Sequence, residues 1–449
     1  MTPSTLTDLP LEAGPLPTTE PAVSASALTR QLTVTIGAPV RPRRLAALRR
    51  LLETIGEDPG GNAVLPLGSL PRVHFARLVL LERTRDLDGN AIPAQLLYMC
   101  DIDEPLTEHL DDLLALSPGL DLVFGTCEEY PTRSEATHRT RLRWLTRHTI
   151  ETQAYYVNTV GLTVAQTLRD AQLRDRIETF LDSRDWHGLD ALEIRTAIRE
   201  YVEGCPDLAW ALQPLPRRSL IDRARDAASV ALPLAGAAAS APVWLPLLPC
   251  YLVALRLQEL CDTVETERPS AAHERQLAEL EDFGPQNQFS AVGFVKQGLL
   301  RRATIGVGVR GLDIAARHVF NSSSLAGVKT IHFAHWTMLD SGRRLIFTSN
   351  YDGTVKSYND DFIDKLWWGL NLVFSNGVGW PRTFLLIWGG CRDEQAFKYY
   401  LRRHQVPTQV WYSAYPNLTA LNITNNARVR TGLTGSMSSE EAKQWLRLI

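Results

Sequence analysis

The chain has 449 residues, more than a single typical hydrophobic core accommodates, which predicts two or three domains. Its 47 Lys and Arg residues against 50 Asp and Glu residues give a formal charge of −3, so no global positive field is present to hold nucleic acid. The six cysteines show no Cys-x-x-Cys spacing, which argues against a zinc site and a disulfide framework. We therefore expect reduced core cysteines, a cytoplasmic location and no nucleic-acid partner.

The first thirty residues are rich in Pro, Thr and Ser and lack the basic start and continuous apolar core of a signal peptide. This composition predicts a disordered leader over residues 1–30.

Four blocks of sequence occur twice in the same order, which indicates an internal duplication. The paired blocks are VHFARLVLLE (73–82) with IHFAHWTMLD (331–340), LLYMCDIDEPLTEHLDDLL (96–114) with LIFTSNYDGTVKSYNDDFI (345–363), LDLVFGTCEEYP (120–131) with LNLVFSNGVGWP (370–381), and TRHTIETQAYYVNTVGLT (146–163) with RRHQVPTQVWYSAYPNLT (402–419).

Each copy predicts the order βαββαβ of a ferredoxin-like unit. The opening strands are expected at 32–40 and 289–300, the first helices at 43–56 and 311–320, and the closing strands at 152–159 and 408–415. We predict an α+β fold with unit 1 at 31–185, a helical linker at 186–285 and unit 2 at 286–449. Two such units commonly pair their sheets, either as one extended sheet or as a barrel-like body with helices outside, within one chain or across a homodimer. A ligand cavity is then expected where the sheets meet.

Residues 227–255 contain no charged side chain, and this segment is long enough to cross a bilayer core. A single span would separate the two copies, and four prolines interrupt the segment. The alternatives are an interfacial membrane element and a buried helical connector. In the membrane reading, a net basic cluster meets anionic head groups and apolar side chains enter the acyl region. These residues are Arg217, Arg218, Arg223 and Arg225, followed by Trp244, Leu245, Leu247, Leu248, Tyr251 and Leu252.

GVGVRG (306–311) fits the Gly-x-Gly-x-x-Gly pattern of dinucleotide-binding loops, but a split βαββαβ unit is the wrong context for it. We interpret it as a loop with glycines before a helix. DLDGN (86–90) and DIDE (101–104) lack the remaining ligands of a calcium loop and are expected as a hairpin turn and a strand end. No metal site is predicted.

Two histidine positions are kept in both copies, His74 with His332 and His148 with His404. Such retention fits either two related sites or histidines that satisfy backbone groups at equivalent corners. Because copy two carries most of the aromatic residues, we place any site there. Its expected catalytic residues, which offer carboxylate, imidazole and phenol groups for proton transfer, are Asp352, His404, Tyr412, His332 and His335.

The stretches 286–296, 316–336, 347–365 and 393–420 resemble a bacterial family of tandem ferredoxin-like units, and the inferred topology is similar to the dimeric α+β barrel superfamily. That superfamily includes dye-decolorising peroxidases, whose Gly-x-x-Asp-Gly motif places an aspartate on the distal side of haem. SNYDG (349–353) matches it at Asp352 and Gly353 and departs from it at Ser349. The resemblance implies haem as a cofactor, with His404 assigned as axial ligand from its position alone.

Two hypotheses follow from the sequence. In the first, a membrane-peripheral oxidoreductase, peroxidase-like or monooxygenase-like, acts on a lipophilic small molecule in copy two at the inner face of the membrane. In the second, a non-catalytic lipid-binding or membrane scaffolding protein uses its histidines and aromatic residues only for packing.

Overall fold

The structure is a computed structural model that describes residues 29–213, 220–320 and 324–449. The predicted leader therefore falls almost wholly outside the described residues, as do Arg217 and Arg218. The side chain of Arg223 is likewise not described.

The protein is a mixed α and β structure with two antiparallel sheets, which confirms the predicted class at that level. The first sheet has five strands in the order β13-β2-β5-β1-β6. Their bounds are β1 Gln31–Pro39, β2 Val73–Leu81, β5 Gln95–Asp103, β6 Thr149–Ile150 and β13 Val410–Ser413. The second sheet has four strands in the order β7-β9-β10-β8, with bounds β7 Thr152–Val157, β8 Gln286–Phe294, β9 Ile331–Leu339 and β10 Arg344–Asp352.

The closing strands are exchanged between the two sheets, which the sequence did not predict. Strand β7, from the first half of the chain, pairs with β9 of the second half, with Tyr155 opposite His335. Strand β13, from the second half, pairs with β2 of the first half, with Trp411 opposite Arg77. Each exchange covers an edge of the other half's sheet, so neither half completes its own sheet.

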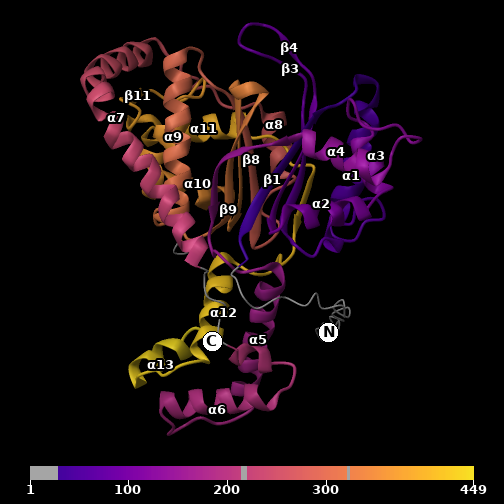
Figure 1. The fold of residues 1–449 in the computed structure, drawn as a ribbon, viewed down its shortest axis with the longest axis vertical. Coiled ribbons are helices and arrows are strands. Elements are labelled where there is room, and N and C mark those ends of the chain that lie inside the picture. The colour runs from indigo at the N-terminus through magenta and orange to yellow at the C-terminus, as the bar shows by residue number, and fades with distance from the viewer. Residues whose placement is uncertain (1–28, 214–219, 321–323) are drawn as a thin grey trace, which may run out of the picture.

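The two sheets face each other, and helices cover their outer faces (Figure 1). Apolar side chains of both sheets meet between them, among them Val79 and Met99 from the first sheet and Leu339 and Ile346 from the second. The outer helices are α1 Leu45–Glu57, α2 Leu106–Ala115, α3 Gly119–Phe124 and α4 His138–Arg147 over the first sheet, and α9 Leu299–His318, α10 Val355–Phe374 and α11 Glu394–His404 over the second. Helix α8 Ala271–Ala278 contacts α11, since His273 Nε2 lies 3.0 Å from the Arg402 carbonyl.

Four further helices form a separate extension at one end of the sheets (Figure 1). They are α5 Val164–Asp182, α6 Ala191–Gly204, α12 Ala420–Gly432 and α13 Ser439–Leu446. Their common core includes Leu173, Ile177, Val202, Val429 and Trp445. The extension takes one helix pair from each half of the chain, so part of the segment expected as a linker packs here instead.

Short elements complete the description. They are the hairpins β3 Thr84–Arg85 with β4 Ala91–Ile92 and β11 Thr383–Phe384 with β12 Trp388–Gly389, and the 3-10 turns Pro42–Arg44, Leu67–Ser69, Ala209–Leu212, Asp340–Gly342 and Gly390–Arg392. The β3–β4 hairpin turns at Gly89, whose φ is +86°, as the DLDGN stretch predicted.

The GVGVRG stretch lies inside α9, so its interpretation as a loop is wrong. The helix begins at Leu299 rather than after the glycines. Glycines inside a helix are unfavourable by about 1 kcal/mol each. Gly308 faces α10, where an added Cβ would lie 3.7 Å from the Leu372 carbonyl oxygen. Packing by Ile305 and Val309 on the same buried face stabilises the helix against this cost.

Candidate functional site

A histidine and an aspartate pair in the same way in each half of the chain. His74 Nε2 lies 3.0 Å from Asp103 Oδ1, and His332 Nε2 lies 2.7 Å from Asp352 Oδ1. The second carboxylate oxygen of each aspartate accepts the first backbone N–H of a helix in the extension, 2.9 Å from Val164 N and 2.8 Å from Ala420 N. Both pairs therefore anchor the extension to the sheets, a structural role at equivalent corners.

The two histidine–aspartate pairs differ in what the second ring nitrogen of the histidine, Nδ1, contacts. The Tyr415 hydroxyl lies 2.8 Å from His74 Nδ1, within hydrogen-bond distance, and burial holds the pKa of Tyr415 well above its usual value. The corresponding position of the other copy is Thr159, and His332 Nδ1 has no hydrogen-bond partner among the described residues. His332 lines a small cavity at the junction of the sheets, with about 20 Å³ of room for water-sized molecules. That volume suits about one water molecule.

A buried polar network connects the two sheets. Arg77 on β2 donates to Asn350 Oδ1 on β10, and its guanidinium also reaches the Phe289 carbonyl over 2.8 Å. His335 on β9 lies 2.9 Å from Asp101 on β5, and Asp101 accepts from Asn350 over 3.0 Å. Burial lowers the pKa of Arg77 to about 10, which keeps its charge at neutral pH.

This network explains the differences between the copies that suggested a specialised site. Arg77 and His335 occupy equivalent positions of the repeat, as do Asp101 and Asn350. Arg77 on the first sheet bonds to Asn350 on the second, and His335 on the second sheet bonds to Asp101 on the first. The residues that differ between the two halves are therefore hydrogen-bond partners across the sheets. His335 is therefore fully engaged inside the protein.

His404 lies apart from these groups, at the end of α11, beside an apolar pocket under α9 and α10. Its Nδ1 is 2.9 Å from the Tyr400 carbonyl, which can only accept, so Nδ1 carries the proton and Nε2 keeps its lone pair. His148 makes the same contact with the Trp144 carbonyl. The pocket is lined by Ala291, Phe294, Ile305, Phe347, Phe374, Gly377, Tyr400 and His404, among others.

Burial lowers the pKa of His404 below its ordinary value of 6.5. We expect a histidine titration by NMR to show the His404 ring neutral at pH 7, in the Nδ1–H tautomer, with a midpoint below 6.5. The signal is assigned by its loss in His404→Gln. A midpoint above 6.5 would contradict the buried, neutral state.

A porphyrin does not fit beside His404. The pocket has about 30 Å³ of room for water-sized molecules. Strand β8 packs directly against the imidazole, since a Cβ added at Gly293 would lie 3.2 Å from His404 Cδ2. The described residues thus do not match the haem expected from the resemblance, and no chemistry is derived through it.

The five predicted catalytic residues do not form one site. His332 and Asp352 are paired at the sheet ends, and His335 lies between the sheets. His404 lies in the apolar pocket, and Tyr412 is on β13, where its ring neighbours Gly60. Arg77 and Tyr400 were missed as partners. The difference between HFAR in the first half and HFAH in the second was a signal for Arg77. The spacing of four residues between Tyr400 and His404 was a signal for Tyr400.

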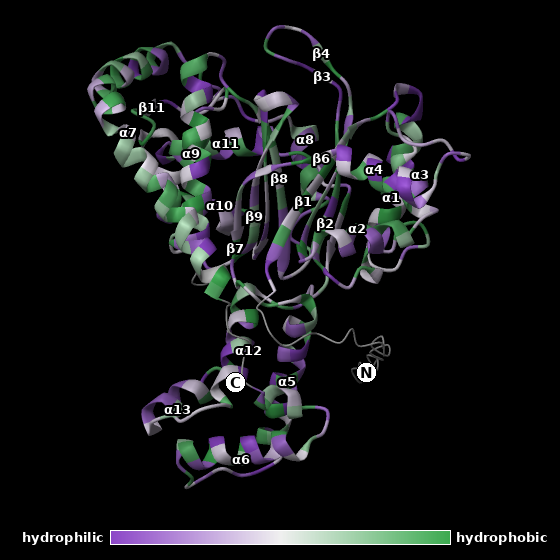
Figure 2. Ribbon diagram, viewed as in Figure 1, coloured by the Kyte–Doolittle hydropathy of each residue, from purple (hydrophilic) through white to green (hydrophobic). Residues whose placement is uncertain are grey.

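The uncharged segment forms part of a single long helix, α7 Leu220–Cys261, on the outside of α9 (Figures 1 and 2). Residues 231–250 are exposed apart from Ala241, which is half-buried, so the alternative of a buried connector is not what this structure shows. Of the predicted membrane residues, Trp244, Leu245, Leu247 and Leu248 are exposed, whereas Tyr251 and Leu252 are half-buried. By length and composition, residues 224–261 could cross a membrane.

Both ends of α7 are tied to the same body. Ser229 Oγ lies 2.9 Å from His318 Nε2, and the Tyr251 hydroxyl lies 2.9 Å from Thr304 Oγ1. The α7 contacts are 22 residues apart, about 33 Å along a straight helix, whereas those on α9 are 14 residues apart, about 21 Å. Helix α7 therefore bows outward (Figure 1), and nothing lies within 4 Å of a Cβ added at Gly311, between the two contacts.

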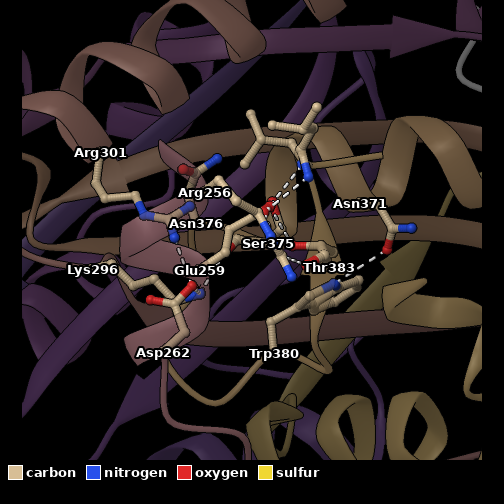
Figure 3. A network of polar contacts seen from close by, with 12 residues as sticks. Arg256, Glu259, Asp262, Lys296, Arg301, Asn371, Ser375, Asn376, Trp380 and Thr383 are labelled. Atoms are coloured by element: carbon tan, nitrogen blue, oxygen red, sulfur yellow. Dashed lines mark hydrogen bonds and ion pairs between the residues drawn. The ribbon is translucent and has the colours of Figure 1, made fainter. Parts of the chain in front are cut away.

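The C-terminal end of α7 is fixed by Glu259, which is buried. Its carboxylate accepts from Thr383 Oγ1 at 2.9 Å and from the backbone N–H groups of Leu385 and Leu386 at 2.9 and 2.8 Å. Arg256 pairs with the same carboxylate (Figure 3).

Comparison with known proteins adds no identity, since no family model, curated protein or solved structure matches the chain.

Proposed function

We propose that the protein is a membrane-peripheral, lipid-binding protein that docks through α7 on the cytoplasmic face of a membrane. The observation that carries the proposal is the exposed, uncharged surface of residues 231–250. Contiguous exposed apolar surface of this extent is typical of membrane and protein interaction sites. Within the proposal, the chain is a duplicated ferredoxin-like unit of the α+β barrel kind with exchanged closing strands.

The energetics of α7 favour insertion over exposure to water. Within residues 227–255, six large apolar side chains are each more than half exposed: Leu232, Leu234, Val243, Leu245, Leu247 and Val253. Transfer of each into an apolar medium contributes about 1 kcal/mol, or roughly 6 kcal/mol together. Such a contribution supports reversible attachment of a soluble body.

The geometry supports a helix that lies in the interface rather than a span. Ser229 and Tyr251, near the two ends of the apolar segment of α7, both contact α9, so this segment cannot place its ends on opposite sides of a bilayer. An interfacial helix penetrates about 5–10 Å. The exposed aromatic side chains of Phe384 and Trp388, at the C-terminal end of α7, suit the head-group level. Arg310 on the exposed face of α9 suits anionic head groups.

Vesicle flotation tests this proposal. We expect the double variant Leu245→Glu with Leu247→Glu to reduce flotation with anionic vesicles at least tenfold, because two carboxylates would have to enter the acyl region. The matched control is Leu122→Glu with Leu189→Glu, which changes two exposed leucines that lie outside α7. Equal flotation of both double variants, or a stable homodimer in which α7 is covered by a second copy, would contradict membrane docking.

An enzyme acting on a lipophilic substrate is the second candidate. The observation that favours it is the Nε2 lone pair of His404 beside the Tyr400 hydroxyl in an apolar pocket, an arrangement suited to a general base. An absorption spectrum of protein purified from its native host tests the oxidoreductase form of this candidate. A flavin band, together with turnover that His404→Gln removes, would support it, and a featureless spectrum without turnover would leave lipid binding.

A further inference from the structure

Two cations share one carboxylate at the start of α9, next to the end of α7 (Figure 3). Asp262 Oδ2 lies 2.7 Å from Lys296 Nζ and 2.6 Å from Arg301 Nη2. The nearby carboxylate of Glu259 is occupied by Arg256, by Thr383 and by backbone N–H groups. The pair of cations therefore retains one unbalanced positive charge.

Polar atoms in this cluster lack partners although they are buried. Arg301 is 1% exposed, and its Nε and Nη1 have no hydrogen-bond partner among the described residues. Ser375 Oγ and Asn376 Oδ1 are buried without partners as well. An unsatisfied buried donor costs about 1–3 kcal/mol, more for a charged group. A guanidinium with free donors and net positive charge around it suits an anionic oxygen ligand.

The cluster adjoins the His404 pocket on three chain segments. Lys296 follows the pocket residue Phe294 by two positions, and Arg301 lies one helical turn before Ile305. Ser375 and Asn376 lie between the pocket residues Phe374 and Gly377. A charged group and an apolar pocket are thus placed end to end, which is the arrangement that an amphiphile requires.

We infer that Lys296 and Arg301 bind the anionic head group of a single-chain amphiphile whose hydrocarbon chain enters the His404 pocket. The head group is a carboxylate or a phosphate, both of which supply the oxygens that a guanidinium binds in bidentate fashion. This inference rests on the proposed function, because a lipid surface supplies such molecules. Asp262 directly follows α7, so the membrane helix and the anion site share one segment of chain. The pocket has about 30 Å³ of room in this structure, so the flexible hydrocarbon chain must displace its apolar side chains, whereas a rigid porphyrin would also have to reach His404 past β8.

The test is calorimetric titration of the full chain with ten-carbon probes, without vesicles. We expect decanoate or decyl phosphate to bind at least tenfold more tightly than decanol. Arg301→Gln is expected to weaken binding of the charged probe at least tenfold and to leave decanol binding unchanged. The matched control is Arg302→Gln, since Arg302 is exposed and adjacent. If Arg301→Gln does not fold, Lys296→Gln serves in its place, with the same expectation.

The outcomes separate this inference from membrane docking. Preference for decanoate over decyl phosphate indicates a free fatty acid, and the reverse indicates a phosphorylated lipid. Equal binding of decanol and the charged probes, or equal losses in Arg301→Gln and Arg302→Gln, would overturn the anion site. Flotation on neutral vesicles by Arg301→Gln is expected to persist, whereas the α7 double variant is expected to lose flotation and keep decanoate binding.

Discussion

Replacing Arg77 by leucine is expected to lower the free energy of unfolding by about 3–5 kcal/mol, because it breaks a buried charged network. The substitution removes the donors to Asn350, to Ser290 and to the backbone of β8 and β10. It also removes the positive charge that faces Asp101 between the sheets. Urea denaturation followed by circular dichroism measures the change.

The control for Arg77 is Arg310→Leu, since Arg310 is exposed on α9 and is expected to change stability by less than about 0.5 kcal/mol. A second test uses the same network. Arg77→His combined with Asn350→Asp places two carboxylates in contact, since Asn350 Nδ2 lies 3.0 Å from Asp101 Oδ2, and it removes the Arg77 charge that faces them. The double variant is therefore expected to be at least about 1 kcal/mol less stable than Arg77→His alone. A loss below about 1 kcal/mol for Arg77→Leu would show that the network contributes little.

Asp352→Ala is expected to lower the free energy of unfolding by about 2–4 kcal/mol. The alanine variant loses the partner of His332 and leaves the first N–H of α12 without an acceptor. Asp352→Asn keeps one acceptor oxygen and is expected to lose less, about 1–2 kcal/mol. Thermal unfolding and protease cleavage of the extension measure both variants.

Asp103→Ala is the matched variant, since Asp103 makes the same two contacts with His74 and Val164. We expect the losses in free energy of unfolding of Asp103→Ala and Asp352→Ala to differ by less than about 1 kcal/mol. A folded Asp352→Ala variant of unchanged stability that has lost only an activity would contradict the anchoring role. It would support the catalytic assignment predicted from the sequence.

Much of the secondary structure follows from local pattern. The HFA blocks form β2 and β9, and the alternation after them forms β5 and β10. Phe362, Leu366, Leu370 and Val373 form one buried face of α10, as their spacing predicts. These predictions succeed because strand and helix periodicity depend on neighbouring residues, and each copy repeats the same pattern.

Two local predictions were wrong. The glycines of GVGVRG indicated a loop, but the apolar residues around them pack a buried helix face. The cysteines were expected in the core, yet Cys250 and Cys261 are exposed on α7. The apolar character of residues 227–255 was plain from the sequence, whereas their exposure on one face of the body was decided by the fold.

The sequence by itself determined the positions of many strands and helices and the uncharged character of α7, because both depend on residue types along the chain. The tertiary structure decided the exchange of β7 and β13 between the sheets, since strand partners far apart in sequence depend on how two halves pack. That exchange also decided the candidate site. It joins Arg77 to Asn350 and His335 to Asp101 inside the protein, and it leaves His404 alone beside an apolar pocket near Lys296 and Arg301.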